Sequence, residues 1–192
     1  MVHIKDVNPT FYPELPDVFP SEKPHTLFSY LDEARPDKAS HQIYNKFFNV
    51  VHNKEKQSES RMANFLCEHR FEQQQIKSQD GKHILPQGLF HRKYYLDGEL
   101  IAVSVFCIMP HGVESYYFFY DPKYKPLSLG VVSVKWEIDF VLEKQKHFPE
   151  FKYYTPGSYI HHTSKMNYKI KYQPMDILCP VTLQWVPFTK EL

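Results

Sequence analysis

The chain lacks an excess of either charge, because its 23 Lys and Arg residues balance 22 Asp and Glu residues and leave a formal net charge of +1. This balance excludes a globally basic surface for nucleic acid, so any contact with a polyanion must come from a local patch. No stretch is apolar enough to span a bilayer, and the N-terminus has no charged segment followed by an apolar one. We therefore expect a cytoplasmic protein, with the nucleus as a second location.

Cysteine is also scarce. The three cysteines, Cys67, Cys107 and Cys179, form no CxxC pair, and their number is odd. This pattern predicts neither a disulfide framework nor a zinc or iron–sulfur site. The 11 histidines include no HExxH motif and no spaced His/Cys cluster. The sequence thus predicts no metal site.

What the 192 residues do contain is a globular composition, with 42% hydrophobic and 16% aromatic residues. Residues 1–24 hold five prolines and read as an extended arm. Residues 26–34 could form a short helix capped by Thr26 and ended by Pro36. We therefore divide the chain into a Pro-rich arm with a short helix, residues 1–40, and a folded domain, residues 41–192.

Hydrophobic periodicity predicts helices in the first half of this domain and again after its strands, over residues 41–53, 60–71 and 129–146. The polar residues 72–86 read as a loop. Asp97-Gly98 is a hairpin turn signal between two strand-like runs. The predicted strands are 88–96, 99–109, 113–120, 151–155 and 181–188. Helices, a β-meander, a helix and further strands predict an α+β fold with a mainly antiparallel sheet flanked by helices.

The order of elements from 88 to 160 resembles the core of the GNAT acyltransferases, which implies a GNAT-like fold. In that fold a helix N-terminus faces the pyrophosphate of coenzyme A, at an R/Q-x-x-G-x-G/A motif. The corresponding run, residues 127–132 (LSLGVV), keeps Gly130 but lacks the Arg or Gln and the second small residue. Val132 would crowd a pyrophosphate there. Coenzyme A is therefore not expected as the donor, although a CoA-dependent N-acetyltransferase stays an alternative.

The stretch from 153 to 180 interleaves aromatic rings with cations. It holds five tyrosines, two histidines and three lysines, with Asp176 as its only acidic residue. Tyrosine rings stack on bases and ammonium groups neutralise phosphates, so this pattern favours binding of a nucleic-acid end. A buried aromatic cluster beside a solvated loop would have a similar composition.

Three ordered blocks carry a more specific signal. They are residues 88–103 (GLFHRKYYLDGELIAV), residues 120–138 with Y-D-P, L-S-L-G, Ser133 and Glu137-Ile138, and residues 157–180 with G-x-Y-I-H, K-M-x-Y-K and L-C-P. In this order they resemble the C-terminal region of the arginyl-tRNA–protein transferases, over about residues 40–188. That family's N-terminal region with paired cysteines has no counterpart in this sequence.

The resemblance implies an enzyme that moves arginine from Arg-tRNA to the α-amine of proteins beginning with Asp or Glu, in the N-degron pathway. The donor ester is already activated, so the step needs no cofactor besides the co-substrate Arg-tRNA. The alternatives are a non-catalytic module that binds tRNA or protein N-termini, and a leucyl- or phenylalanyl-specific transferase.

Three residues are the candidate catalytic residues, namely Asp121, Glu137 and Tyr120. Asp121 could pair with the guanidinium of the donor, since a carboxylate matches its planar fork, or it could merely begin a turn. Glu137 lies in a mostly apolar helix, where an ionised carboxylate needs a partner. It could bind arginine, accept a proton or form an internal salt bridge.

Candidate substrate-binding residues follow from the same blocks. His161, Lys165 and Lys169 could read the acidic side chain of an acceptor, or form a solvated basic loop. Ser128, Leu129 and Gly130 could hold the terminal phosphate or ribose of the tRNA, or serve as a simple helix cap. Tyr120, Tyr159, Tyr168 and Tyr172 could stack on the terminal adenosine, or lie in the core. His91 could face the cleft or the solvent, and the matched positions Ser133, Gly157 and Met166 complete this set.

Overall fold

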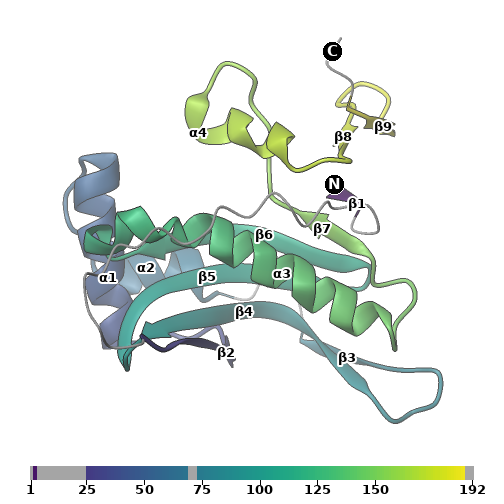
Figure 1. Ribbon diagram of the computed structural model, residues 1–192, viewed down its shortest axis with the longest axis horizontal. Helices are drawn as coiled ribbons and strands as arrows, with labels where there is room; N and C mark the ends of the chain where they lie inside the picture. Colours follow the sequence, from purple (N-terminus) through teal and green to yellow (C-terminus); the bar gives the residue numbers. More distant parts are fainter. Residues whose placement is uncertain (1, 4–24, 69–72, 189–192) are drawn as a thin grey trace.

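A seven-stranded sheet forms the centre of the computed structural model, which describes residues 2–3, 25–68 and 73–188. The strand order is β1-β7-β6-β5-β4-β2, and β3 also pairs with β4 (Figure 1). All neighbouring strands are antiparallel except β6 and β7. The strands are β1 (Val2–His3), β2 (Leu27–Glu33), β3 (Gln74–Lys77), β4 (Ile84–Leu96), β5 (Glu99–Met109), β6 (Gly112–Tyr120) and β7 (Tyr153–Thr155).

Helices cover both faces of this sheet. Helices α1 (Lys38–His52) and α2 (Glu59–Leu66) pack on one face, where their apolar side chains form a core with Val103 and Val105 of β5. Helix α3 (Leu129–Gln145) crosses the other face, where it packs on Phe106 and Ile108 (Figure 1). Alternate residues of a strand point to opposite faces, which is why the nearly continuous apolar run of β5 is buried on both sides. The predicted α+β fold is confirmed.

The first two helices begin at polar caps that the periodicity did not mark. Asp37 accepts the backbone N–H of Ser40 at 2.8 Å, so α1 begins three residues earlier than predicted. Ser58 does the same for Arg61 at 3.2 Å and starts α2. Helix α2 ends at Leu66, and the end of the helix predicted over 60–71 falls partly outside the described residues.

Two predictions of local structure are wrong. Residues 26–34 contain strand β2 rather than a helix, because the segment pairs along its whole length with β4, from Leu27 opposite Leu96 to Glu33 opposite Phe90. Thr26 caps no helix; its backbone N–H donates to Asp97 at 2.9 Å. Residues 72–86, predicted as a loop, include β3 and the beginning of β4. Residues 74–87 form a projecting hairpin, whose polar sequence reflects its exposure rather than a lack of structure.

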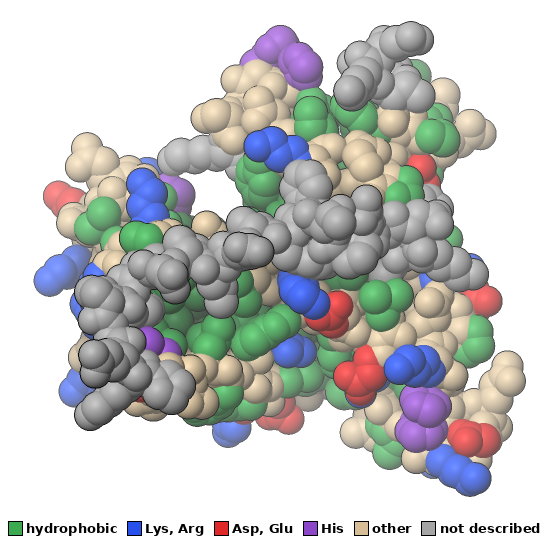
Figure 2. All heavy atoms as spheres, viewed as in Figure 1, with side chains coloured by type: hydrophobic (Ala, Val, Ile, Leu, Met, Phe, Trp, Pro, Cys, Tyr) green, Lys and Arg blue, Asp and Glu red, His purple; other side chains and the backbone are tan. Residues whose placement is uncertain are grey.

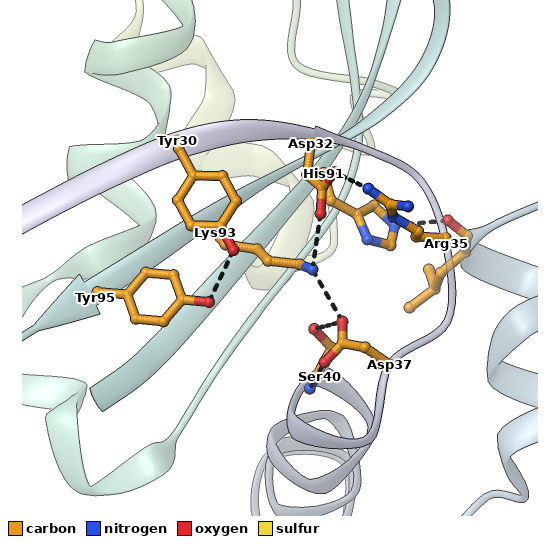
Figure 3. A network of polar contacts seen from close by, with 9 residues as sticks. Tyr30, Asp32, Arg35, Asp37, Ser40, His91, Lys93 and Tyr95 are labelled. Atoms are coloured by element: carbon orange, nitrogen blue, oxygen red, sulfur yellow. Dashed lines mark hydrogen bonds and ion pairs between the residues drawn. The ribbon is translucent and has the colours of Figure 1, made fainter. Parts of the chain in front are cut away.

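An ion network around the buried Lys93 ties β2, β4 and α1 together (Figure 3). The Lys93 ammonium lies 3.2 Å from Asp32 and 3.1 Å from Asp37, the residue that caps α1. Arg35 also pairs with Asp32, at 2.9 Å. Burial works against the charge of Lys93, but the two carboxylates outweigh it and raise the pKa of the ammonium. The network therefore fixes the start of α1 against the edge of the sheet.

A separate lobe follows the sheet in sequence. It comprises α4 (Ser164–Asn167), η4 (Tyr168–Lys171) and a two-stranded sheet of β8 (Asp176–Leu178) and β9 (Trp185–Pro187). The last predicted strand, 181–188, is thus shorter and pairs outside the main sheet. In Figure 1 this lobe lies beyond β7, and its Met175, Ile170 and Tyr172 pack on the core of the main body. Basic and acidic side chains are interspersed over the surface visible in Figure 2.

The remaining sequence predictions concern parts of the chain that the structure describes only in part. The proline-rich arm lies outside the described residues, apart from Val2 and His3, which pair with β7. None of the described helices has the length and apolar character needed to cross a membrane. Within the same residues, no group of three His, Cys, Asp or Glu side chains could hold a metal ion. The division of the chain at residue 40 stays a prediction.

Candidate active site

A cavity of about 320 Å³ opens where β6 and β7 separate. The two strands pair in parallel only at residues 112–114 and 153–155, and β6 then continues to Tyr120 while β7 ends. The N-terminus of α3 covers the resulting wedge on one side, and η4 lies at its outer rim. The lining residues are Ser115, Phe118, Tyr120, Lys125, Ser128, Leu129, Gly130, Val131, Ser133, Val134, Tyr154, Pro156, Tyr168 and Tyr172.

The start of α3 is presented to this cavity by a short 3-10 helix, η3 (Pro122–Leu127). Ser128 joins the two helices in the left-handed conformation, with φ of 51°, and its side chain makes no capping hydrogen bond. Its carbonyl nevertheless accepts the N–H of Val131 at 2.8 Å. Backbone N–H groups at a helix start favour anions. Ser128 thus caps α3 through its backbone carbonyl, and it lines the cavity together with Leu129 and Gly130.

Glu137 lies beneath the cavity and is 1% exposed. Its Oε1 accepts hydrogen bonds from the hydroxyls of Ser133, at 3.0 Å, and Ser104. Burial is the main influence on this carboxyl and raises its pKa, against the opposing effect of the hydroxyls. The internal salt bridge considered from the sequence is not seen in the described segments, where hydroxyl groups surround Glu137.

Tyr154 closes the same polar cluster from β7. Its hydroxyl and the Oε2 atom of Glu137 are buried, and neither makes a hydrogen bond of normal geometry within the described residues. They still interact electrostatically, since burial and the nearby Glu137 raise the pKa of Tyr154 well above its ordinary value. Ser115 also interacts with both groups. Beneath the floor of the cavity there is thus a carboxyl group enclosed by four hydroxyls, three of which belong to the lining residues Ser115, Ser133 and Tyr154.

Three of the predicted stacking tyrosines surround the cavity. Tyr120 is half-buried and stacks on Phe118 with 5.9 Å between ring centroids. Tyr168 is 44% exposed at the outer rim and meets Tyr172 edge to face. Tyr159 does not line the cavity; its hydroxyl lies 2.8 Å from Nδ1 of His161 in the outer lobe. The structure therefore brings together three of the four rings.

Lys169 is neither a solvated charge nor a free reader of acidic side chains, because it is 6% exposed. Its ammonium donates to the carbonyl of Ser158 at 2.7 Å and lies 3.9 Å from Sδ of Met166. Burial lowers the pKa of Lys169. Gly157, whose φ is +77°, lets the chain turn at this contact. Lys169, Gly157 and Met166 thus hold the segment after β7 against η4.

The other predicted readers of an acceptor belong to the exposed end of this lobe. His161 is exposed, as is its neighbour His162. The side chain of Lys165 is not described. His161 is therefore the member of the predicted basic set that the structure shows at the surface.

Asp121 and His91 are not at the cavity. Asp121 pairs with Lys46 at 2.6 Å and accepts the N–H of Lys123 at the start of η3. Burial alone would raise the pKa of Asp121, but these contacts outweigh it and lower that pKa. His91 is fully buried and hydrogen-bonds the carbonyl of Leu66, with burial lowering its pKa. The prediction that His91 faces the cleft or the solvent is wrong, because α2 covers this side of β4.

Sequence reasoning missed several residues of the site, among them Ser104, Ser115, Tyr154 and Lys125. Ser104 stands in the buried run of β5, where a polar side chain must find a partner. That is the one local signal that could have revealed it. Ser115 and Tyr154 come together only through the parallel pairing of β6 and β7.

A mixed sheet that opens beside a single parallel strand pair, with a helix N-terminus at the opening, is the arrangement of a GNAT-like α+β fold. Residues 39–179 match the family described as arginine-tRNA-protein transferase, C terminus. The match covers more than half of the chain, which therefore belongs to this family.

Named relatives fit this assignment. The chain is 39% identical over 161 residues to arginyl-tRNA–protein transferase 1 of Arabidopsis thaliana, covering 83% of this chain and 26% of the relative. It is 49% identical over 102 residues to the Drosophila melanogaster protein of that name, covering 53% of this chain and 21% of the relative. An aspartate/glutamate leucyltransferase of Pseudomonas fluorescens is 36% identical over 102 residues, covering 53% of this chain and 40% of the relative. The chain spans about a quarter of the length of its Arabidopsis relatives, 26% and 28%.

Proposed function

We propose that this domain transfers arginine from Arg-tRNA to the α-amine of proteins that begin with Asp or Glu. The observation that supports this most is the wedge cavity over Glu137, which lies inside the segment that matches the transferase family. The reaction is aminolysis of an ester. It needs a site that aligns two large substrates and stabilises a tetrahedral oxyanion, and it requires no resident cofactor.

The lining residues suggest how the donor would sit. The terminal adenosine would stack on the exposed Tyr168 and on Tyr172 at the rim. Its phosphate would approach the start of α3, where Ser128 and Lys125 lie. The ester carbonyl would then point to the backbone N–H groups of Leu129 and Gly130 at the start of α3, which can donate to a developing oxyanion.

The guanidinium of the donor meets no carboxylate among the described lining residues. Asp121, our first choice from the sequence, is paired with Lys46, and Glu137 is enclosed by hydroxyls. We propose that the faces of Phe118 and Tyr120 hold the guanidinium, because a cation is attracted to the face of an aromatic ring. Such contacts contribute about 0.5–2 kcal/mol.

The same lack of a carboxylate among the described lining residues also favours a second donor, Leu-tRNA. The cavity walls are largely apolar at Phe118, Leu129, Val131 and Val134, and relatives named leucyltransferases match 102 residues of this chain. Leucine would fit such walls without needing a carboxylate. The acceptor would be the same in both cases, with His161 of the outer lobe as the group that meets its acidic side chain. Either reaction would take place in the cytoplasm, where charged tRNA is available.

Transfer of a labelled amino acid tests this proposal. The full chain would be incubated with labelled Arg-tRNA or Leu-tRNA and peptides that begin with Asp, Glu or Ala. We expect label from Arg-tRNA on the Asp and Glu peptides and none on the Ala peptide. Label transferred from Leu-tRNA but not from Arg-tRNA would show that the donated amino acid is leucine rather than arginine. Binding of tRNA without label on any peptide would contradict the proposed activity.

A further inference from the structure

The hydrogen bonds of Ser133 leave one position open. A serine hydroxyl has one hydrogen and two lone pairs. The hydrogen of Ser133 points to Oε1 of Glu137 at 3.0 Å, and one lone pair accepts the hydroxyl of Tyr94 at 3.2 Å. Ser133 also lines the cavity. Its remaining lone pair is thus available to an N–H or O–H group of a molecule bound there.

Glu137 is well placed to hold a proton and poorly placed to bind a guanidinium. A guanidinium could reach its carboxyl only by displacing Ser133, Ser115 or Tyr154, all of which stand between it and the cavity. Oε1 already accepts two hydroxyls, whereas Oε2 is buried without a hydrogen bond of normal geometry in the described residues. A proton taken up by this carboxylate would remove a buried charge, and Oε1, to which the Ser133 hydrogen points, is the oxygen that can receive it.

We infer that Glu137 is the proton-holding group of the transfer reaction and that Ser133 carries the proton between it and the reacting amine. This inference rests on the proposed aminoacyl transfer. The neutral α-amine attacks the ester carbonyl, and the new C–N bond leaves an extra proton on nitrogen. That proton passes to Oγ of Ser133 while the Ser133 hydrogen passes to Glu137.

The second half of the reaction reverses this movement. The bond between the carbonyl carbon and the ribose oxygen breaks, and the ribose oxygen takes the proton back through Ser133. Glu137 ends as it began, so the amide and the free ribose hydroxyl form without another reactant. Ser133 is the residue that touches the substrate, and Glu137 acts through it.

Two serines provide a matched test. Ser133 and Ser104 are both buried and both donate to Oε1 of Glu137, but only Ser133 lines the cavity. We expect Ser133→Ala to lower kcat about 100-fold with little change in KM for the aminoacyl-tRNA, because a positioned proton carrier contributes about 10²–10⁴-fold. Ser104→Ala should lower kcat by less than about tenfold. The two variants should have similar melting temperatures, so that a difference in kcat between them does not come from a difference in stability.

The pH dependence of Glu137→Gln completes the test. In the wild type, the acceptor amine and Glu137 must both be deprotonated, so the acid limb of log kcat/KM should approach a slope of about 2. In the Glu137→Gln variant only the amine must be deprotonated, so the acid limb of log kcat/KM should have a slope of about 1. Equal effects of the two serine variants, or a Glu137→Gln change confined to KM for Arg-tRNA, would overturn the inference while leaving the transferase function intact. A wild-type chain without any transfer would overturn the proposed function and this inference with it.

Discussion

Gly112→Ala should lower the free energy of unfolding by about 3 kcal/mol, because an added methyl group has no space at this position. A Cβ at Gly112 would overlap the carbonyl oxygen of Tyr153, its partner across the parallel pair of β6 and β7. Both backbones are held there, since the N–H groups of Lys152 and Tyr153 donate to the carbonyl of His111. The clash must therefore be relieved by separating the two strands.

Denaturant unfolding would measure this effect, with Gly130→Ala as the control. A Cβ at Gly130 would meet only the ring of Phe118 at 3.8 Å, an ordinary contact. Gly130 lies in α3, where alanine is favoured over glycine by about 0.5–1 kcal/mol. Gly130→Ala should thus be neutral or slightly stabilising. If Gly112→Ala unfolded at the same denaturant concentration as the wild type, the parallel pairing of β6 and β7 would be refuted.

Val131→Trp should lower kcat/KM for aminoacyl-tRNA by about 100-fold, because misplacing a substrate by about 1 Å can cost that much. Val131 is half-buried and lines the cavity at the start of α3, so an indole ring there would occupy the space assigned to the donor. Steady-state transfer assays and tRNA binding would measure the loss. We expect weaker binding of Arg-tRNA as well as slower transfer.

Val132→Trp is the matched control for this variant. Val132 is the next residue of the same helix and is also half-buried, but it does not line the cavity. Its substitution should change kcat/KM less than about threefold, with a similar melting temperature. Equal activity in the two variants would mean that the donor binds elsewhere.

Periodicity predicted the elements whose own residues determine their structure. The strands on either side of Asp97-Gly98 and the long helix α3 lie close to their predicted bounds. Strand β2 was missed because its conformation depends on pairing with β4, whose partner residues lie 57 to 69 positions away in the chain. Local propensity does not contain that contact.

The site was predicted in part, for a similar reason. Motif blocks located Glu137, Ser133 and the start of α3, which line or support the cavity. They did not reveal which carboxylate is already paired, so Asp121 was favoured although Lys46 neutralises it. Nor did they show that Lys169 is buried against Ser158. Burial and pairing arise from tertiary packing, and the roles of charged residues depend on both.

The position of the donor in the wedge between β6, β7 and α3 is the central claim, and NMR mapping with a stable analogue tests it directly. The ester would be replaced by an amide in 3′-arginylamino-3′-deoxyadenosine, which cannot be transferred. Titration into the labelled chain should shift the backbone signals of residues 128–134 together with those of Tyr154 and Tyr168. Shifts confined to another surface, such as the cleft formed by Leu27, Arg92 and Trp136, would contradict the account.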